Sequence, residues 1–311
     1  MFDLFIIILI VIFLIIVFYI VIGVVSYYSI LIPKFLASFD KIYGRTDYKY
    51  EKTRKSIERE SKWFDKIGYD IEKLSGFDGE VLYAYRVNHL DSNKWVIINH
   101  QYTQRALDMG NYAKHFYEMG YNLILPDLRG HGLSETGYMS MGCYDRLDLL
   151  QWVDFIIEED CDSEILLYGV SMGAATVMCV SGEDLPVNVK CVIEDCGYTS
   201  LWDEFTSQNR LKPIPAWPYL LVMDFLTRVK LGFHLKEASA IDQVAKSKIP
   251  ILFIHGTKDN FVPYSMHSKL YDAATCEKEK LSIEGAKHSH SAYKDPVLYW
   301  DTIEMFLKKY L

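Results

Sequence analysis

Apolar and polar residues alternate along this chain in blocks that predict strands and helices in turn. Residues 106–119 and 144–159 carry apolar side chains at helical spacing, and Pro296 opens a last helix with Asp295 as its N-cap. Residues 76–80 separate two short runs and predict a hairpin. Strands alternating with helices predict a mostly parallel sheet with helices on both faces, an α/β fold. Apolar runs of strand length occupy residues 95–99, 121–125, 164–168, 190–194, 250–256 and 280–284.

The first segment differs from all the others because it is apolar on every side. Leu4 to Val25 is almost wholly Ile, Leu, Val and Phe, and no charged residue lies between Asp3 and Lys34. A helix of this length can cross a hydrocarbon core of about 30 Å. The start is not basic and no small-residue cleavage site follows, which favours a retained anchor over a signal peptide. The lack of a polar face argues against a buried core helix. We expect residues 1–32 to be a single-pass transmembrane anchor, in contact with the lipid bilayer.

The charges that follow this segment predict its orientation. Lys34, Lys41, Arg45 and Lys49 lie after it and no basic residue precedes it, so the positive-inside rule favours a cytoplasmic globular domain. An external domain is the alternative. Residues 33–62 form a charged juxtamembrane connector, which either touches anionic headgroups or is a solvated linker. Residues 63–311 form the globular domain.

Composition narrows the class of protein. About 250 of the 311 residues remain after the anchor and the connector, enough for one large domain. The net charge of −8 argues against a nucleic-acid partner, which selects for basic surfaces. Six cysteines occur without any CxxC pair, which does not suggest a disulfide scaffold and favours a reducing compartment.

The pentapeptide Gly169-Val170-Ser171-Met172-Gly173 is the strongest chemical signal. It follows a predicted strand and precedes a run of small residues, the strand–turn–helix setting of a nucleophile elbow. Such a turn is so tight that the residues flanking the serine must be nearly free of side chains. The alternative is a glycine-rich turn with a purely structural role and no catalytic residue.

A serine nucleophile needs a base, and the base needs an orienting acid. Asp259 follows the predicted strand at 250–256, and His288 follows the one at 280–284. The C-terminal ends of parallel strands meet at one edge of a sheet, so we expect Ser171, Asp259 and His288 to meet there as a catalytic triad.

These motifs resemble the α/β-hydrolase superfamily from about Trp63 to the C-terminus. The segment Asp127-Leu128-Arg129-Gly130-His131-Gly132-Leu133-Ser134 is similar to the family's D-x-R-G-x-G-x-S turn, where the resemblance implies a structural role for His131. The chain looks most like bacterial serine aminopeptidase-like and monoacylglycerol-lipase-like hydrolases, some with a membrane anchor. The resemblance implies that residues 198–249, rich in aromatic and aliphatic side chains, are a small cap-like insertion over the site. The alternative is that they only pack onto the sheet.

The resemblance also implies an oxyanion hole from the backbone N–H groups of Met172 and Tyr102. One position departs from the family pattern, because Gln101 stands where a glycine is usual after His100. If that position requires a positive φ, glutamine would cost about 1 kcal/mol or more.

Several nearby residues compete for these roles. His290 is the rival base, and Glu194 and Asp195 are rival acids. The pair His288 and His290 raises the alternative of a metal site, but no third ligand has convincing spacing. We therefore predict no metal and no organic cofactor.

Taken together, the sequence predicts a membrane-anchored serine hydrolase that cleaves a small-molecule carboxylic ester with an apolar acyl group. Three alternatives stay open: a serine aminopeptidase, an acyltransferase on the same triad, and a catalytically inactive binding module presented at the membrane. The aminopeptidase needs an acid to hold the substrate amine, for which the candidates are Asp203, Glu204, Asp224 and Glu237.

Overall fold

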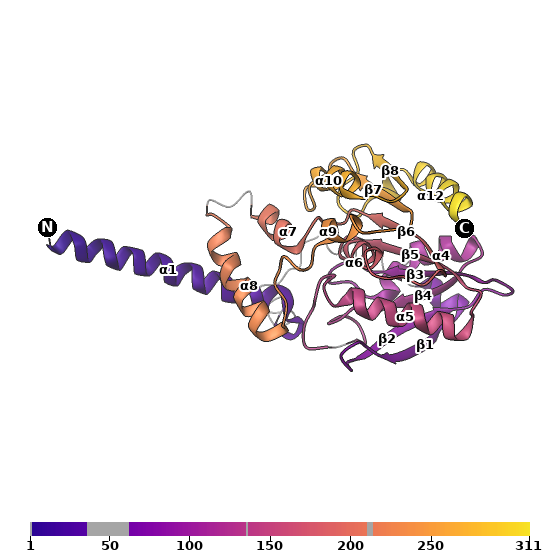
Figure 1. The fold of residues 1–311 in the computed structure, drawn as a ribbon, viewed down its shortest axis with the longest axis horizontal. Helices are drawn as coiled ribbons and strands as arrows, with labels where there is room; N and C mark the ends of the chain where they lie inside the picture. The colour runs from indigo at the N-terminus through magenta and orange to yellow at the C-terminus, as the bar shows by residue number, and fades with distance from the viewer. Residues whose placement is uncertain (1, 36–61, 135, 210–213) are drawn as a thin grey trace.

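The computed structural model describes residues 2–35, 62–134, 136–209 and 214–311 (Figure 1). Within these residues, one sheet has the strand order β1-β2-β4-β3-β5-β6-β7-β8. β1, β2 and β4 pair antiparallel, and all pairs from β4 to β8 are parallel. The predicted mostly parallel sheet and the hairpin at residues 76–80 are therefore confirmed. The strands are β1 Asp70–Ser75, β2 Val81–Val87, β3 Lys94–Asn99, β4 Asn122–Pro126, β5 Glu164–Val170, β6 Val189–Asp195, β7 Ile251–Gly256 and β8 Lys278–Ile283.

Helices cover both faces of this sheet because successive side chains of each strand point to opposite sides. In β5, Leu166 and Tyr168 enter the apolar core on one face, while Ile165 and Leu167 enter the core on the other. The first core is completed by η1 (Ala106–Met109), α4 (Gly110–Glu118), α11 (Ser291–Lys294) and α12 (Pro296–Tyr310). The second is completed by α5 (Asp145–Glu159), α6 (Met172–Ser181), α9 (Ala240–Val244) and α10 (Ser265–Ala273). The predicted helix at residues 106–119 begins as a 3₁₀ turn, and Asp295 caps α12 as expected.

The first helix, α1 (Phe2–Leu31), projects from one end of the domain (Figure 1). It is long and apolar enough to cross a membrane. Its side chains are exposed as far as Phe18, but Gly23, Tyr27 and Leu31 are buried against the domain. Most of the predicted connector, residues 36–61, lies outside the described residues.

Two helices interrupt the βα alternation between β6 and β7. They are α7 (Leu201–Gln208) and α8 (Trp217–Leu231), and α8 crosses the end of α1 (Figure 1). The crossing is close, since a β-carbon added at Gly23 would lie 2.5 Å from Cβ of Val222. The end of α1, the two inserted helices and the loops at this end of the sheet share a third apolar cluster.

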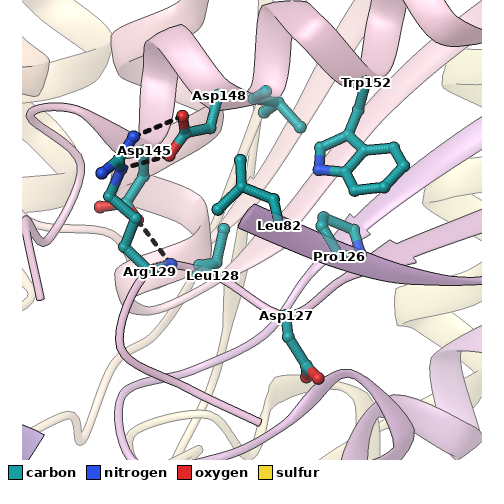
Figure 2. Close-up of a pocket in the computed structure, with 9 residues that line it drawn as sticks. Leu82, Pro126, Asp127, Leu128, Arg129, Asp145, Asp148 and Trp152 are labelled. Carbon is teal, nitrogen blue, oxygen red and sulfur yellow. Dashed lines mark hydrogen bonds and ion pairs between the residues drawn. The ribbon is translucent and has the colours of Figure 1, made fainter. Parts of the chain in front are cut away.

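The turn at residues 127–134 is structural. Asp127 accepts hydrogen bonds from the N–H groups of Ala106 and Leu133, both at 2.8 Å. A β-carbon at Gly132 would lie 2.0 Å from this carboxylate, and φ there is +51°, so only glycine fits. The neighbouring Arg129 turns the other way and meets Asp148 of α5, as Figure 2 shows. Its guanidinium is buried and also donates to Asp78, at 2.7 Å.

The two carboxylates around Arg129 provide a test of stability. Asp148 is nearly buried, whereas the side chain of Asp78 is 30% exposed. Removing a buried partner leaves a desolvated charge, so we expect Asp148→Asn to cost about 3 kcal/mol of unfolding free energy. Asp78→Asn, the matched control, should cost about 1 kcal/mol or less. Urea unfolding of the full-length protein in detergent measures both, and equal costs would contradict the prediction.

Candidate active site

Ser171 lies in a turn whose backbone geometry is unusual for a residue with a side chain. It joins β5 to α6 with φ 56° and ψ −113°. The turn has no room for β-carbons on either side. A β-carbon at Gly169 would lie 2.2 Å from the carbonyl oxygen of Gly173, and one at Gly173 would lie 2.2 Å from that of Asn99 in β3. A hydrogen bond of 2.8 Å from the N–H of Ser171 to the carbonyl oxygen of Asp195 fixes the turn to β6. The tight strand–turn–helix geometry predicted for the pentapeptide is therefore present.

The structure brings the three predicted site residues into one hydrogen-bonded row. Ser171 Oγ lies 2.8 Å from Nε2 of His288, and Nδ1 of His288 lies 2.7 Å from Oδ2 of Asp259. Because a carboxylate can only accept, Nδ1 carries the ring proton and donates it to Asp259. Nε2 is then the acceptor for the serine hydroxyl, which is the arrangement a general base requires.

The carboxylate of Asp259 is held by donors on several sides. Its Oδ1 accepts from the N–H groups of Phe261 and Val262, at 2.8 and 2.9 Å, and its Oδ2 lies 3.3 Å from Nε2 of His255. Burial alone would raise the pKa of Asp259, but the hydrogen bonds from His255 and His288 lower it to about 2. Asp259 is thus a charged acceptor at any pH near neutrality.

Two buried histidines fix the loop after β3. His100 accepts from the N–H of Leu128 at Nε2, 3.0 Å away, and its Nδ1 donates to the carbonyl oxygen of Gln101, 2.8 Å away. His131 accepts from the N–H of Thr103, 3.3 Å away. Burial lowers the pKa of both imidazoles, and the proximity of His131 adds to the effect on His100. Neutral rings are what this pattern of donors and acceptors requires. His131 therefore has a structural contact, as the resemblance implied.

The expected strain at Gln101 is absent. The residue with positive φ in this loop is Thr103, with φ 64°, and Gln101 is not among the described residues with positive φ. The condition for a cost at Gln101 is therefore not met, because the loop places its left-handed residue two positions later. Met172 begins α6, where the first N–H groups of a helix have no intrahelical acceptor. The oxyanion roles of Met172 and Tyr102 stay predictions.

The rival acids and base have other partners. Asp195 accepts from the hydroxyls of Ser291 and Tyr299, at 3.1 and 3.0 Å. Glu194 accepts from the N–H of Gly197. His290 is the N-cap residue of α11, and its Nδ1 lies 2.6 Å from the carbonyl oxygen of His288. In the described structure, none of these three side chains forms a hydrogen bond with the Ser171 hydroxyl, whose partner is His288.

Two further residues around His288 escaped the sequence analysis. The ring of Phe261 lies 4.8 Å from the imidazole, centroid to centroid, with 32° between the planes. The buried Cys196 places its thiol with Asp259 and His288 so that their ligand atoms lie within 4.8 Å of one another, a spacing that could hold a metal ion. Asp259 and His288 already hydrogen-bond to each other. Burial also strongly raises the pKa of the Cys196 thiol, which disfavours the thiolate that a metal ion needs as a ligand. No periodic pattern in the sequence marks either residue.

Glu204 is the one buried residue among the four acids proposed to hold an amine; it is only 3% exposed. Gln208 donates to both Glu204 and the carbonyl oxygen of Phe261, each at 2.7 Å, and so links α7 to the loop that holds Asp259. Burial raises the pKa of Glu204 to about 7; the Gln208 hydrogen bond opposes this, and the Asp259 carboxylate adds to it.

With this geometry in view, comparison with known proteins identifies the family. Residues 108–311 match the prolyl oligopeptidase family (Peptidase_S9). The chain belongs to the prolyl oligopeptidase family. It is a serine hydrolase of the α/β-hydrolase superfamily, as the motifs suggested.

Proteins similar to this chain occur in bacteria, yeast and archaea. It is 28% identical to the uncharacterized protein YqkD of Bacillus subtilis, over 92% of each chain. It is 24% identical to the uncharacterized membrane protein YNL320W of Saccharomyces cerevisiae, over 76% of this chain and 82% of the yeast protein. The esterase Pf2001 of Pyrococcus furiosus has the same fold, with a TM-score of 0.64 and 22% identity over 79% of this chain and 94% of the esterase.

The raised pKa of Glu204 predicts a measurable effect of pH on stability. An unfolded glutamate loses its proton near pH 4.3, but the folded one keeps it until about pH 7, so this residue costs stability as pH rises through that window. Glu204→Gln keeps the shape and removes the charge. We expect the variant to gain roughly 2 kcal/mol over wild type at pH 8 compared with pH 5. Unfolding in urea at both pH values measures this, with the exposed Glu304→Gln as a control that should show no gain; the same pH dependence in wild type and Glu204→Gln would contradict it.

Proposed function

We propose that this protein is a membrane-anchored serine hydrolase that cleaves carboxylic esters with an apolar acyl group, using Ser171, His288 and Asp259. The observation that carries the proposal is the unbroken row of hydrogen bonds from the Ser171 hydroxyl through His288 to the Asp259 carboxylate. Each member has the neighbour that its chemistry needs.

In the first half of the reaction, Ser171 Oγ attacks the ester carbonyl carbon as Nε2 of His288 takes the hydroxyl proton. The carbonyl oxygen becomes an oxyanion, which the N–H groups of Met172 and Tyr102 would stabilise. Asp259 stays ionised and stabilises the imidazolium. His288 then donates its proton to the alkoxide leaving group, which departs as an alcohol and leaves an acyl-enzyme.

The second half repeats these steps with water as the nucleophile. His288 takes a proton from water, whose oxygen attacks the acyl carbon of the ester on Ser171. The second tetrahedral intermediate collapses, and His288 returns the proton to Ser171 Oγ. The carboxylic acid leaves, and the row of hydrogen bonds is restored.

The surroundings of Met172 support an apolar acyl group. Met172 belongs to the third apolar cluster, together with side chains of α7, α8 and the end of α1. We assign residues 198–249, which include α7 and α8, as the cap. The members of the cluster from this region include Leu201, Phe205, Tyr219, Leu220, Met223, Phe233 and Leu235.

The anchor is supported by the length of α1, by its apolar exposed surface and by a yeast relative described as a membrane protein. The basic residues after it, from Lys34 onward, favour a cytoplasmic catalytic domain.

Peptide or amino-acyl amide cleavage is the second candidate, because the matching family is one of oligopeptidases. The same row would perform this chemistry, with an amine as the leaving group. All four proposed amine-binding acids accept local hydrogen bonds. The donors are Thr199 for Asp203, Gln208 for Glu204, His234 for Asp224 and the N–H of His234 for Glu237. These contacts favour the ester over the amide substrate.

The nucleophile and base are tested together. A fluorophosphonate should modify Ser171, and Ser171→Ala should abolish labelling in a protein that stays folded. His288→Ala should lower ester turnover by at least about 10³-fold, because members of such a row act as a unit.

His290→Ala is the matched control for the base, since His290 is two residues away and exposed. It should keep most of the activity. If folded Ser171→Ala were still labelled, Ser171 would not be the nucleophile. If His288→Ala kept most of the ester turnover and His290→Ala lost it, His290 would be the base instead.

The substrate class is tested with esters of increasing acyl length. Each methylene buried against the third apolar cluster contributes about 0.8 kcal/mol, or roughly fourfold in kcat/KM. Activity should rise from acetyl to octanoyl esters, and part of the gain will appear in KM. A flat profile, or a preference for amino-acyl amides with a free amine, would favour the peptidase.

A further inference from the structure

One side of α8 carries an apolar stripe that the domain does not cover. Trp217, Leu221, Phe225 and Val229 recur at every fourth residue, and their exposed fractions lie between 52% and 65%. Residues four apart share one side of a helix. The opposite side of α8 is buried at Tyr219, Leu220, Met223 and Thr227, and the first three belong to the third apolar cluster. The stripe therefore faces away from the domain.

The length of the exposed part of α1 indicates where the surface of a bilayer would lie relative to this stripe. Asp3 marks one end of the uncharged run. Every side chain of α1 from Phe2 to Phe18 is exposed, whereas beyond Phe18 the exposed Ile20, Val21 and Val25 alternate with residues that are partly or fully buried. At about 1.5 Å per residue, Leu4 to Phe18 spans about 22 Å, which is less than the hydrocarbon thickness of about 30 Å. A bilayer that α1 crosses must then extend about five residues further, to the region of Gly23.

Gly23 is where α8 lies against α1. A β-carbon there would meet both Val222 and the carbonyl oxygen of Tyr219 at less than 3 Å. Figure 1 shows α8 crossing α1 at the end of the domain from which α1 projects. The membrane surface that α1 defines thus coincides with the position of α8.

The rest of α8 suits the boundary between acyl chains and headgroups. Tryptophan favours this boundary, and Trp217 begins the helix. The last turn carries the exposed Arg228 and Lys230, and Nζ of Lys230 lies 6.0 Å from the ring of Tyr28 on α1. The one acidic residue of the helix, Asp224, accepts from the N–H of Leu235 at 2.7 Å and from His234. Its charge is thus satisfied within the protein.

We infer that α8 is a second membrane contact: its stripe of Trp217, Leu221, Phe225 and Val229 lies in the interface of the bilayer that α1 spans. The inference rests on the anchor in the proposed function and goes beyond it. It commits to a lipid surface, because α8 packs on the membrane-spanning helix at Gly23 and carries basic residues in its last turn, beside the exposed apolar stripe. The same helix contributes to the cluster around Met172, so the cap would be seated on the membrane and could receive an apolar ester from it.

Depth-dependent quenching tests the position of α8. The full-length protein, with Cys161 and Cys276 replaced by serine, is reconstituted into phosphatidylcholine vesicles with or without brominated acyl chains. A polarity-sensitive fluorophore is attached to one new cysteine, from Ile12→Cys in α1, Phe225→Cys in the stripe, or Val297→Cys. Val297 on α12 is 68% exposed, similar to Phe225, and is the matched control.

We expect quenching at positions 12 and 225 and none at 297, with lipids brominated near the headgroup quenching position 225 more strongly than those brominated deeper. Quenching at 12 with position 225 behaving like 297 would overturn the stripe and leave the anchor standing. No quenching at either position would overturn both. The probe at position 225 could also report an apolar environment without being quenched by brominated lipid. If copies of the chain then crosslink to one another, a second copy covers the stripe and the inference is overturned.

An activity ratio gives a second test that does not depend on probes. The stripe variant replaces Trp217, Leu221, Phe225 and Val229 with serine, and the control variant replaces Val297 and Met305 of α12 with serine. Turnover of a long-chain ester dissolved in vesicles, divided by that of a soluble short-chain ester, should fall several-fold for the stripe variant only. An unchanged ratio would overturn the inference. If the wild-type protein hydrolysed neither ester, the result would count against the esterase proposal instead.

Discussion

The turn between β5 and α6 is held by backbone contacts that leave no space for a β-carbon on either side of Ser171. Gly169 touches the start of α6, and Gly173 touches the end of β3. These contacts hold the serine at a positive φ, a conformation that costs of order 1–3 kcal/mol when nothing enforces it. The buried sheet enforces it here, and the hydroxyl is thereby directed to His288. Asp259 and His288 are arranged around this fixed point, since they lie in the loops after β7 and β8, in the parallel part of the sheet.

The buried acids at this edge of the sheet differ in their partners rather than in their depth. Asp259 has two imidazoles and two backbone N–H groups around it, and these bring its pKa down despite burial. Asp195 is equally buried, but its donors are the hydroxyls of Ser291 and Tyr299, and burial raises its pKa to about 6. The contrast explains why Asp259 suits a lasting negative charge beside His288.

The sequence alone predicted the sheet, its helices and the meeting of Ser171, Asp259 and His288, because strand ends and tight glycine turns leave local patterns. It could not predict contacts between segments distant in sequence. The apolar spacing of α8 indicates a helix but not which side faces the domain, and nothing in the run from Leu4 to Val25 marks Gly23 as a point of close crossing. The sequence also left open whether Gln101 takes a positive φ. In the structure the residue that does so is Thr103, whose N–H donates to His131, a residue far along the chain.

The end of α1 also contacts the loops around the candidate site. The hydroxyl of Tyr102, in the loop predicted to supply an oxyanion donor, donates to the carbonyl oxygen of Ile30 at 2.9 Å. The carbonyl oxygen of Leu31 accepts from the N–H of Met139 at 2.9 Å, and Leu31 itself is buried in the same cluster as Met172. These carbonyls are among the last of the helix, which lack intrahelical donors, so the bonds satisfy α1 and position the loops at once. An enzyme shortened by removing α1 would therefore lose more than its attachment to a membrane. It would expose apolar side chains beside Met172 and release the loop that carries Tyr102, so activity lost on truncation would reflect the site as well as the location of the protein.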